Sequence, residues 1–212
     1  MINIKTFVFN PFQENTYVLS DETRECAIVD PGCNSEKEFN VLFAYISSNK
    51  FKPVRLLLTH GHIDHVLGLS VVSENFQLKP EIHKLDLYLT NDFVSQGKIF
   101  GFNARPILNI SVFLEEDIPV LFGNSQLGVL HVPGHTPGSV AFFSHFDKFV
   151  ITGDVLFQGS IGRTDLPGGD YDVLMESINN KLLNLSDEVR IFPGHGPYST
   201  IGEEKKSNPF LS

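Results

Sequence analysis

The chain has 212 residues, of which 42% are hydrophobic and 19% are charged, and its formal net charge is −9. A charged fraction below the average of about 25% argues against a disordered chain, and the acidic balance disfavours a binder of nucleic-acid phosphates. Because no apolar run approaches the roughly 18 residues of a membrane span, we expect no membrane segment. Only two cysteines, Cys26 and Cys33, are present, so we expect reduced thiols in a cytoplasmic protein without a signal peptide.

Short apolar runs bounded by turn residues alternate with apolar residues spaced as on one face of a helix. In chain order, the first half predicts strands at residues 3–9, 15–20 and 26–29, a helix after Asn34, a strand at 54–58, a helix at 66–76, a strand at 80–83 and a helix at 85–94. The second half predicts an irregular surface excursion or lid at 95–109, strands at 111–115, 119–122, 127–132, 139–144 and 148–152, a helix capped by Asp170, a strand at 189–192 and a short helix capped by Thr200. No linker interrupts this alternation, so we expect one α/β domain over residues 1–212.

Several local features favour ordinary structural roles. Ser35 and Glu38 can form a capping box at the start of the first helix. Asn15 is interpreted as a turn residue rather than a catalytic one, and the two cysteines as buried side chains rather than ligands. The aromatic residues Phe93, Phe100 and Phe102 are expected to pack the excursion onto the core, with an apolar lid as the alternative.

The strongest chemical signal is the segment 59–65, which reads Thr-His-Gly-His-Ile-Asp-His. His60 and His62 alternate, so in an extended or looped backbone they project to one side. Asp64 and His65 follow after a turn and can face a second point a short distance away. Imidazole and carboxylate groups suit Zn, Fe or Mn, so the segment predicts metal binding.

The remaining ligands are expected at the ends of other strands. His135, Asp154 and His195 each follow a glycine, and Asp154 and His195 come directly after predicted strands. Glycine permits unusual backbone angles and a close approach of the backbone to a metal. Five of the eight histidines thus fall in loops at strand ends, whereas a role in packing the core would scatter them.

The motif His60-x-His62-x-Asp64-His65, with His135, Asp154 and His195 following in that order, resembles the metallo-β-lactamase superfamily. The resemblance implies a four-layer αββα sandwich, in which two sheets pack face to face between outer helices and metals lie at one edge. It also implies that His60, His62 and His135 hold a first metal. Asp64, His65 and His195 would hold a second metal, and Asp154 would bridge the two. The expected cofactors are two divalent ions, zinc first, with iron or manganese as alternatives.

Two-metal chemistry implies a hydrolase that uses a hydroxide bridging the ions, with Asp64 and Asp154 in catalytic roles. Segments 133–138, 152–157 and 159–165 are most similar to compact glyoxalase II-like enzymes, which are thioesterases for S-acylglutathione. Because we expect no C-terminal helical domain of the kind that binds glutathione in longer members, specificity for glutathione stays open. The alternatives are a mononuclear iron persulfide dioxygenase, using His60, His135 and Asp154, and another small-ester or lactone hydrolase. A non-catalytic metal-binding module is disfavoured, because structural zinc sites are often rich in thiolate ligands and these sites contain none.

The expected partner is a small anionic substrate, with no nucleic acid and no membrane, and the oligomeric state stays open. Arg163, Tyr198 and Lys205 are the candidate substrate-binding residues. An ion pair of Arg163 with Asp165 or Asp170 is an equal alternative for that residue.

Overall fold

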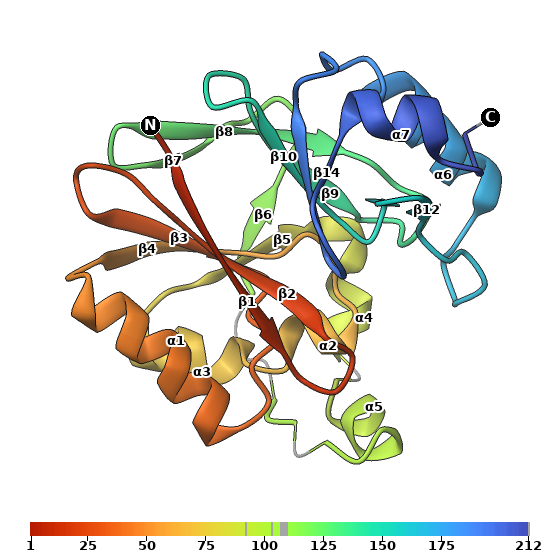
Figure 1. The fold of residues 1–212 in the computed structure, drawn as a ribbon. Helices are drawn as coiled ribbons and strands as arrows, with labels where there is room; N and C mark the ends of the chain where they lie inside the picture. The colour runs from red at the N-terminus through yellow and green to blue at the C-terminus, as the bar shows by residue number, and fades with distance from the viewer. Residues whose placement is uncertain (92, 103, 107–109, 212) are drawn as a thin grey trace.

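Two β-sheets lie face to face between helices in the computed structural model, which describes residues 1–91, 93–102, 104–106 and 110–211 (Figure 1). One six-stranded sheet has the order β1 (Asn3–Phe9), β2 (Glu14–Ser20), β3 (Glu25–Val29), β4 (Lys52–Leu57), β5 (Pro80–His83), β6 (Val112–Leu114). The other has the order β14 (Ser199–Thr200), β13 (Arg190–Pro193), β10 (Phe149–Gly153), β9 (Val140–Ser144), β8 (Ser125–His131), β7 (Val120–Phe122). A short hairpin is formed by β11 (Leu156–Phe157) and β12 (Ser160–Ile161).

Alternation of side chains along the strands divides the core into layers, because successive residues of a strand point to opposite faces. On β2, Tyr17 and Leu19 pack between the two sheets, whereas Val18 packs on the outer side with helical residues. On β10, Phe149 and Ile151 face the other sheet. All five side chains are nearly inaccessible to solvent. The expected four-layer αββα sandwich is therefore confirmed.

Helices cover both outer faces of the sandwich (Figure 1). The helical segments in the first half are α1 (Glu36–Ser48), α2 (Ile63–Val66), α3 (Leu69–Phe76), a 3₁₀ turn (Lys84–Asp86), α4 (Leu87–Asn91) and α5 (Phe93–Ile99). The second half has α6 (Tyr171–Ser177), a π-helical turn (Ile178–Leu182) and α7 (Ile201–Ser207). Leu174, Ile178 and Leu182 are all buried against the second sheet, as their spacing predicts. Within the described residues, none of these helices has the length and apolar content that a membrane crossing requires.

The predicted helix caps are present. Ser35, Asp170 and Thr200 each accept a hydrogen bond from the backbone N–H three residues later, at 3.1–3.2 Å. The capping box at α1 is only half formed, because the Glu38 carboxylate accepts from the backbone N–H groups of Asn10 and Asn34 instead of Ser35. Glu38 thereby ties the start of α1 to the turn that follows β1.

Two of the predicted helices are divided. The helix predicted at 66–76 corresponds mainly to α3, and its first residue is the last residue of α2. Gly68 lies between the two helices, where an added Cβ would clash with Cys33 Sγ and lie 2.8 Å from the Pro31 carbonyl. The stretch predicted at 85–94 becomes the 3₁₀ turn, α4 and the start of α5. Part of the excursion predicted at 95–109 is helical in α5, while its residues 103 and 107–109 lie outside the described residues.

Candidate metal centre

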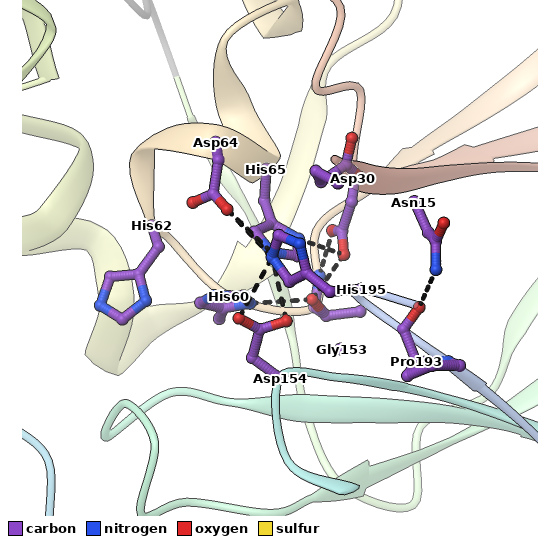
Figure 2. Close-up of polar contacts among 12 residues, drawn as sticks. Asn15, Asp30, His60, His62, Asp64, His65, Gly153, Asp154, Pro193 and His195 are labelled. Atoms are coloured by element: carbon purple, nitrogen blue, oxygen red, sulfur yellow. Dashed lines mark hydrogen bonds and ion pairs between the residues drawn. The ribbon is translucent and has the colours of Figure 1, made fainter. Parts of the chain in front are cut away.

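The predicted ligands come from four separate loops that meet at one edge of the sandwich, and Figure 2 shows those of three of these loops, all except His135. His60 and His62 follow β4, and Asp64 and His65 lie on the single turn of α2. The loop between β8 and β9 contains His135. Asp154 and His195 follow β10 and β13, which are parallel neighbours, so their carboxyl ends lie side by side.

The first cluster contains His60, His62 and His135. Their ring centroids are separated by 4.6–4.9 Å, and one nitrogen of each ring lies within 4.8 Å of the others. His62 Nδ1 and His135 Nε2 are only 2.8 Å apart. Two ring nitrogens at this distance must share either a proton or a cation, so the geometry fits a metal position between them.

The second cluster contains Asp64, His65 and His195, which also offer ligand atoms within 4.8 Å of one another. Asp64 Oδ2 is 3.1 Å from His195 Nε2 and 3.7 Å from His65 Nε2. A carboxylate facing two imidazoles is a donor set that suits zinc, iron or manganese.

Asp154 lies between the clusters. Its Oδ2 is 3.7 Å from His135 Nε2 in the first cluster and 3.5 Å from His195 Nε2 in the second. Its Oδ1 is 3.4 Å from His65 Nε2. One carboxylate therefore reaches both groups of ligands, which is the position that a bridging ligand requires.

Four of the imidazoles are held through Nδ1, which leaves Nε2 facing the centre. The Nδ1 acceptors are Thr59 Oγ1 for His60, Asp30 Oδ2 for His65, the Arg163 carbonyl for His135 and the Phe12 carbonyl for His195, all at 2.8–3.1 Å. A hydrogen bond at one ring nitrogen selects the tautomer and orients the ring, so the other nitrogen is free to bind a metal.

Unsatisfied polar atoms at the centre support metal binding. Within the described part of the chain, His60 Nε2, His65 Nε2 and Asp154 Oδ1 are buried and make no well-formed hydrogen bond, although the last two atoms lie 3.4 Å apart as an ion pair. Buried polar atoms without partners are rare because each costs roughly 1–3 kcal/mol. Both clusters and the bridging position contribute one such atom, and a pair of cations would satisfy all three.

Burial and charge shift the pKa values of these groups in opposite directions. Burial and the neighbouring imidazoles lower the pKa of His60, and burial with His135 lowers the pKa of His62 to about 4. Burial alone would lower the pKa of His65, but the carboxylates of Asp154 and Asp64 outweigh it and raise that pKa. Burial would raise the pKa of Asp154, but His65 outweighs it and lowers that pKa. His60 and His62 are thus neutral imidazoles, ready to bind a cation, whereas a cation bound at His65 displaces a proton.

Two glycines allow the loops to approach this closely. A Cβ on Gly194 would clash with Asp154 Oδ1 and lie 2.7 Å from His65 Cε1. Gly153 has a φ of +51°, and a Cβ there would lie 2.5 Å from Thr59 Oγ1. At these two positions beside the predicted ligands, a residue with a side chain would therefore clash with the neighbouring loop.

Two buried carboxylates that hold the ligand loops were missed by the sequence reasoning. Asp30, with a φ of +49°, accepts from Thr59 N at 2.7 Å, Thr59 Oγ1 at 2.6 Å and His65 Nδ1 at 3.0 Å (Figure 2). Asp30, His60 and His65 also form a third close group, but these hydrogen bonds occupy the carboxylate. The available signal for Asp30 was its place directly after a predicted strand.

Asp86 acts in the same way on the other side of the first cluster. Its carboxylate accepts from Gly61 N at 3.0 Å, Thr136 Oγ1 at 2.7 Å and Gly138 N at 2.6 Å. It thereby joins the loop of His60 and His62 to the loop of His135. Burial raises the pKa of Asp86.

The interpretation of Asn15 as a turn residue is wrong, because it lies in β2. Its side-chain amide donates to the Pro193 carbonyl at 3.0 Å (Figure 2) and to the Gly196 carbonyl at 2.8 Å, on either side of His195. Asn10, at the start of the turn that joins β1 to β2, donates from Nδ2 to the Asp64 carbonyl at 2.9 Å. The β1–β2 hairpin therefore holds two loops of the second cluster.

The cysteines are buried and unpaired, as expected, and burial raises the pKa of both the Cys26 and the Cys33 thiol to about 12.

The three candidate substrate-binding residues are not brought together. Arg163 lines a cavity over the ligands, and its guanidinium makes two 2.7 Å hydrogen bonds to Asp165, which was the alternative considered for it. Tyr198 is 66% exposed and is not among the described residues that line this cavity. Lys205 is also absent from the described residues of that lining, and its ammonium group is 2.7 Å from Asp187.

The sequence model of the metallo-beta-lactamase superfamily matches residues 9–195, a span that includes both clusters and Asp154. The chain belongs to this superfamily. The resemblance noted in the motif is therefore confirmed across most of the chain. The superfamily binds divalent metals, which agrees with the orphaned nitrogen and oxygen atoms at this centre.

Similar members of the superfamily share nearly the full length of the chain. Hydroxyacylglutathione hydrolase GloC of Haemophilus influenzae is 40% identical over 215 residues, covering 100% of this chain and 99% of that protein. The crystal structure of BLEG-1 B3 metallo-beta-lactamase matches with a TM-score of 0.88 at 35% identity, covering 99% of this chain and 100% of that one. TTHA1623 in a di-iron-bound form matches with a TM-score of 0.87 at 38% identity, covering 98% and 100%. The chain is therefore a metal-dependent hydrolase of this superfamily.

Proposed function

We propose that this metallo-β-lactamase superfamily member hydrolyses thioesters of the S-acylglutathione type with a pair of divalent cations. The observation that carries the proposal is the position of Asp154 between two complete ligand clusters. The identity of 40% to a hydroxyacylglutathione hydrolase over nearly the whole of both chains supports the choice of substrate.

The residues around the two clusters have different roles in the proposed reaction. Two bound cations would supply Lewis acidity and lower the pKa of a water molecule toward neutrality. Asp154 sets the separation of the two clusters, because its two oxygens reach toward different imidazoles. Asp64 is 16% exposed and borders the cavity, so it can orient the attacking water and accept its proton. His60, His62 and His135 would hold one cation, and His65, His195 and Asp64 the other.

The second cluster favours hydrolysis over the alternative of a mononuclear iron dioxygenase. That alternative needs only His60, His135 and Asp154, and would leave the Asp64–His195 pair and the unsatisfied His65 Nε2 without a function. Zinc is proposed first for the two positions. Iron is the principal alternative, because TTHA1623, at 38% identity, has been crystallised in a di-iron-bound form.

The proposal is tested by elemental analysis of the purified protein together with four assays. These are hydrolysis of S-lactoylglutathione, of a simple lactone and of a chromogenic β-lactam, and oxygen uptake with glutathione persulfide. Two metals per chain together with thioester hydrolysis support the proposal. Asp154→Asn should then lose both the two-metal content and the hydrolysis. A matched surface variant, Asp187→Asn, should lose neither, because Asp187 only pairs with Lys205. One iron with oxygen uptake, or turnover of the lactone or the β-lactam without thioester hydrolysis, would contradict it.

A further inference from the structure

A cavity of about 640 Å³ lies over the ligand clusters. Its floor is polar and consists of metal-ligand candidates: His62, Asp64, His135, Asp154 and His195. Its walls are mainly apolar and are formed by Phe12, Ile63, Leu89, Phe100, Leu166 and Pro167. A volume of this size accommodates a small organic molecule, and apolar walls around a few convergent polar groups are typical of such sites.

The apolar walls are fixed relative to the ligands. The Phe12 carbonyl accepts from His195 Nδ1 at 3.1 Å, while the Phe12 ring meets the Phe100 ring edge to face at 5.6 Å. On the opposite side, Leu89 packs so closely on the ligand loop that a Cβ at Gly61 would lie 2.9 Å from Leu89 Cβ. A molecule reacting at the floor therefore meets these apolar side chains at defined positions.

Two aromatic rings of the wall are exposed to the cavity side of the protein. Phe12 is 41% exposed and Phe100 is 53% exposed, although they contact each other. When an apolar group of the substrate covers this surface and removes it from water, the binding free energy becomes more favourable.

Polar groups in the walls are already engaged within the protein. Arg163 donates twice to Asp165, and the Tyr88 hydroxyl donates to the Pro167 carbonyl at 3.2 Å. Among the described lining residues, this leaves Gln96 as the neutral polar side chain available to a ligand. Away from Gln96, a substrate hydroxyl buried against these walls would lose water without gaining a partner, whereas a site selective for that hydroxyl would supply one.

We infer that this cavity selects thioesters whose acyl group is apolar and bulky, aromatic or branched, over small hydroxylated acyl groups such as lactoyl. The inference rests on the proposed thioester hydrolysis for its reaction, and on the Phe12–Phe100 and Leu89 walls for its selectivity. It makes Phe100 a specificity-determining residue, because the ring lines the cavity and is not one of the candidate metal ligands.

A matched substrate pair tests the selectivity. S-(3-phenylpropionyl)glutathione and S-propionylglutathione differ only by one phenyl ring, and burying that ring should raise kcat/KM by roughly 10–100-fold. S-lactoylglutathione should be no better than the propionyl compound. Phe100→Ala should reduce the phenylpropionyl-to-propionyl ratio by about tenfold. Phe146→Ala should leave the ratio unchanged, because that ring is 82% exposed and borders a different surface. A preference for lactoyl, or a ratio that Phe100→Ala does not alter, would overturn the inference.

Product binding separates this inference from the proposed function. Calorimetry of the metal-loaded protein should show 3-phenylpropionate binding about tenfold or more tightly than propionate, with the difference reduced in Phe100→Ala. If this difference is found while no thioester is hydrolysed, the proposed reaction fails and the apolar selectivity stands. Equal affinity for the two carboxylates would overturn the selectivity, whatever the reaction.

Discussion

Replacing Asp30 by asparagine should weaken the second metal position without disturbing the fold. Asp30 Oδ2 accepts from His65 Nδ1, which leaves His65 Nε2 facing Asp154. An asparagine amide in this place would donate to His65 Nδ1, so the ring proton would move to Nε2 and block the metal-binding nitrogen. The backbone at Asp30 has a φ of +49°, a conformation in which asparagine is among the best-tolerated residues.

The size of the effect follows from the hydrogen bond that is lost. A hydrogen bond to a charged group contributes roughly 1.5–3 kcal/mol, which corresponds to about 10–150-fold in an equilibrium constant. Loss of a hydrogen-bond partner of a ligating histidine typically costs about 10–100-fold in metal affinity. Thr59 Oγ1 donates to Asp30 Oδ2 and accepts from His60 Nδ1, so the substitution also reaches His60 through this hydroxyl, and the first position should weaken as well.

Competition with a chromophoric chelator, combined with elemental analysis after dialysis, measures the two affinities. We expect Asp30→Asn to hold the second metal about 10–100-fold more weakly than the wild type, with a weaker first position as well. Asp187→Asn is the matched control, because it removes only an exposed ion pair with Lys205. The reasoning is refuted if a folded Asp30→Asn protein binds both metals with wild-type affinity.

Three further predictions concern the hairpin, the thiols and the metals. Asn15→Ala removes two hydrogen bonds to the carbonyls around His195, so it should cost about 1–3 kcal/mol of stability and lower the metal content. The control Asn49→Ala loses one exposed hydrogen bond and should do neither. Denaturant melts and elemental analysis check this, and an unchanged metal content would contradict it. Cys26 and Cys33, with pKa values of about 12, should not react with a thiol reagent at pH 8 until the chain is unfolded, and a fast native reaction would contradict their burial. Removing both metals should lower the melting temperature by roughly 10–20 °C, since each metal bound at 100 times its Kd stabilises by about 2.7 kcal/mol. An unchanged melting temperature would contradict this.

The convergence of the candidate ligands at one place could be predicted because their positions carry local signals in the sequence. His60 and His62 stand directly after an apolar strand, and Asp154 and His195 each follow another strand and a glycine. Strand ends on one side of a sheet lie close together, so seven residues from four loops could be assigned to one place before any coordinates were known. The structure brings them together in two clusters and places Asp154 between them.

The supporting residues could not be predicted because their partners are distant in sequence. Asp86 joins Gly61 to Thr136, which are 25 and 50 residues away from it, and no repeated pattern marks a single buried carboxylate. Asn15 reaches Pro193 across 178 residues, and no local pattern in the sequence marks that contact. Long side chains at the surface were equally ambiguous, because a neighbouring carboxylate such as Asp187 decides where Lys205 points.

Titration of the metal-free protein with zinc, iron(II) or manganese, with thioester turnover followed at each addition, tests the central claim most directly. The two ligand clusters around Asp154 predict little turnover at one equivalent and full turnover as the second equivalent binds. Asp64→Asn, which alters the second cluster alone, should then stop near one equivalent and stay inactive. Full thioester turnover at a single equivalent in the wild type would contradict the two-metal account.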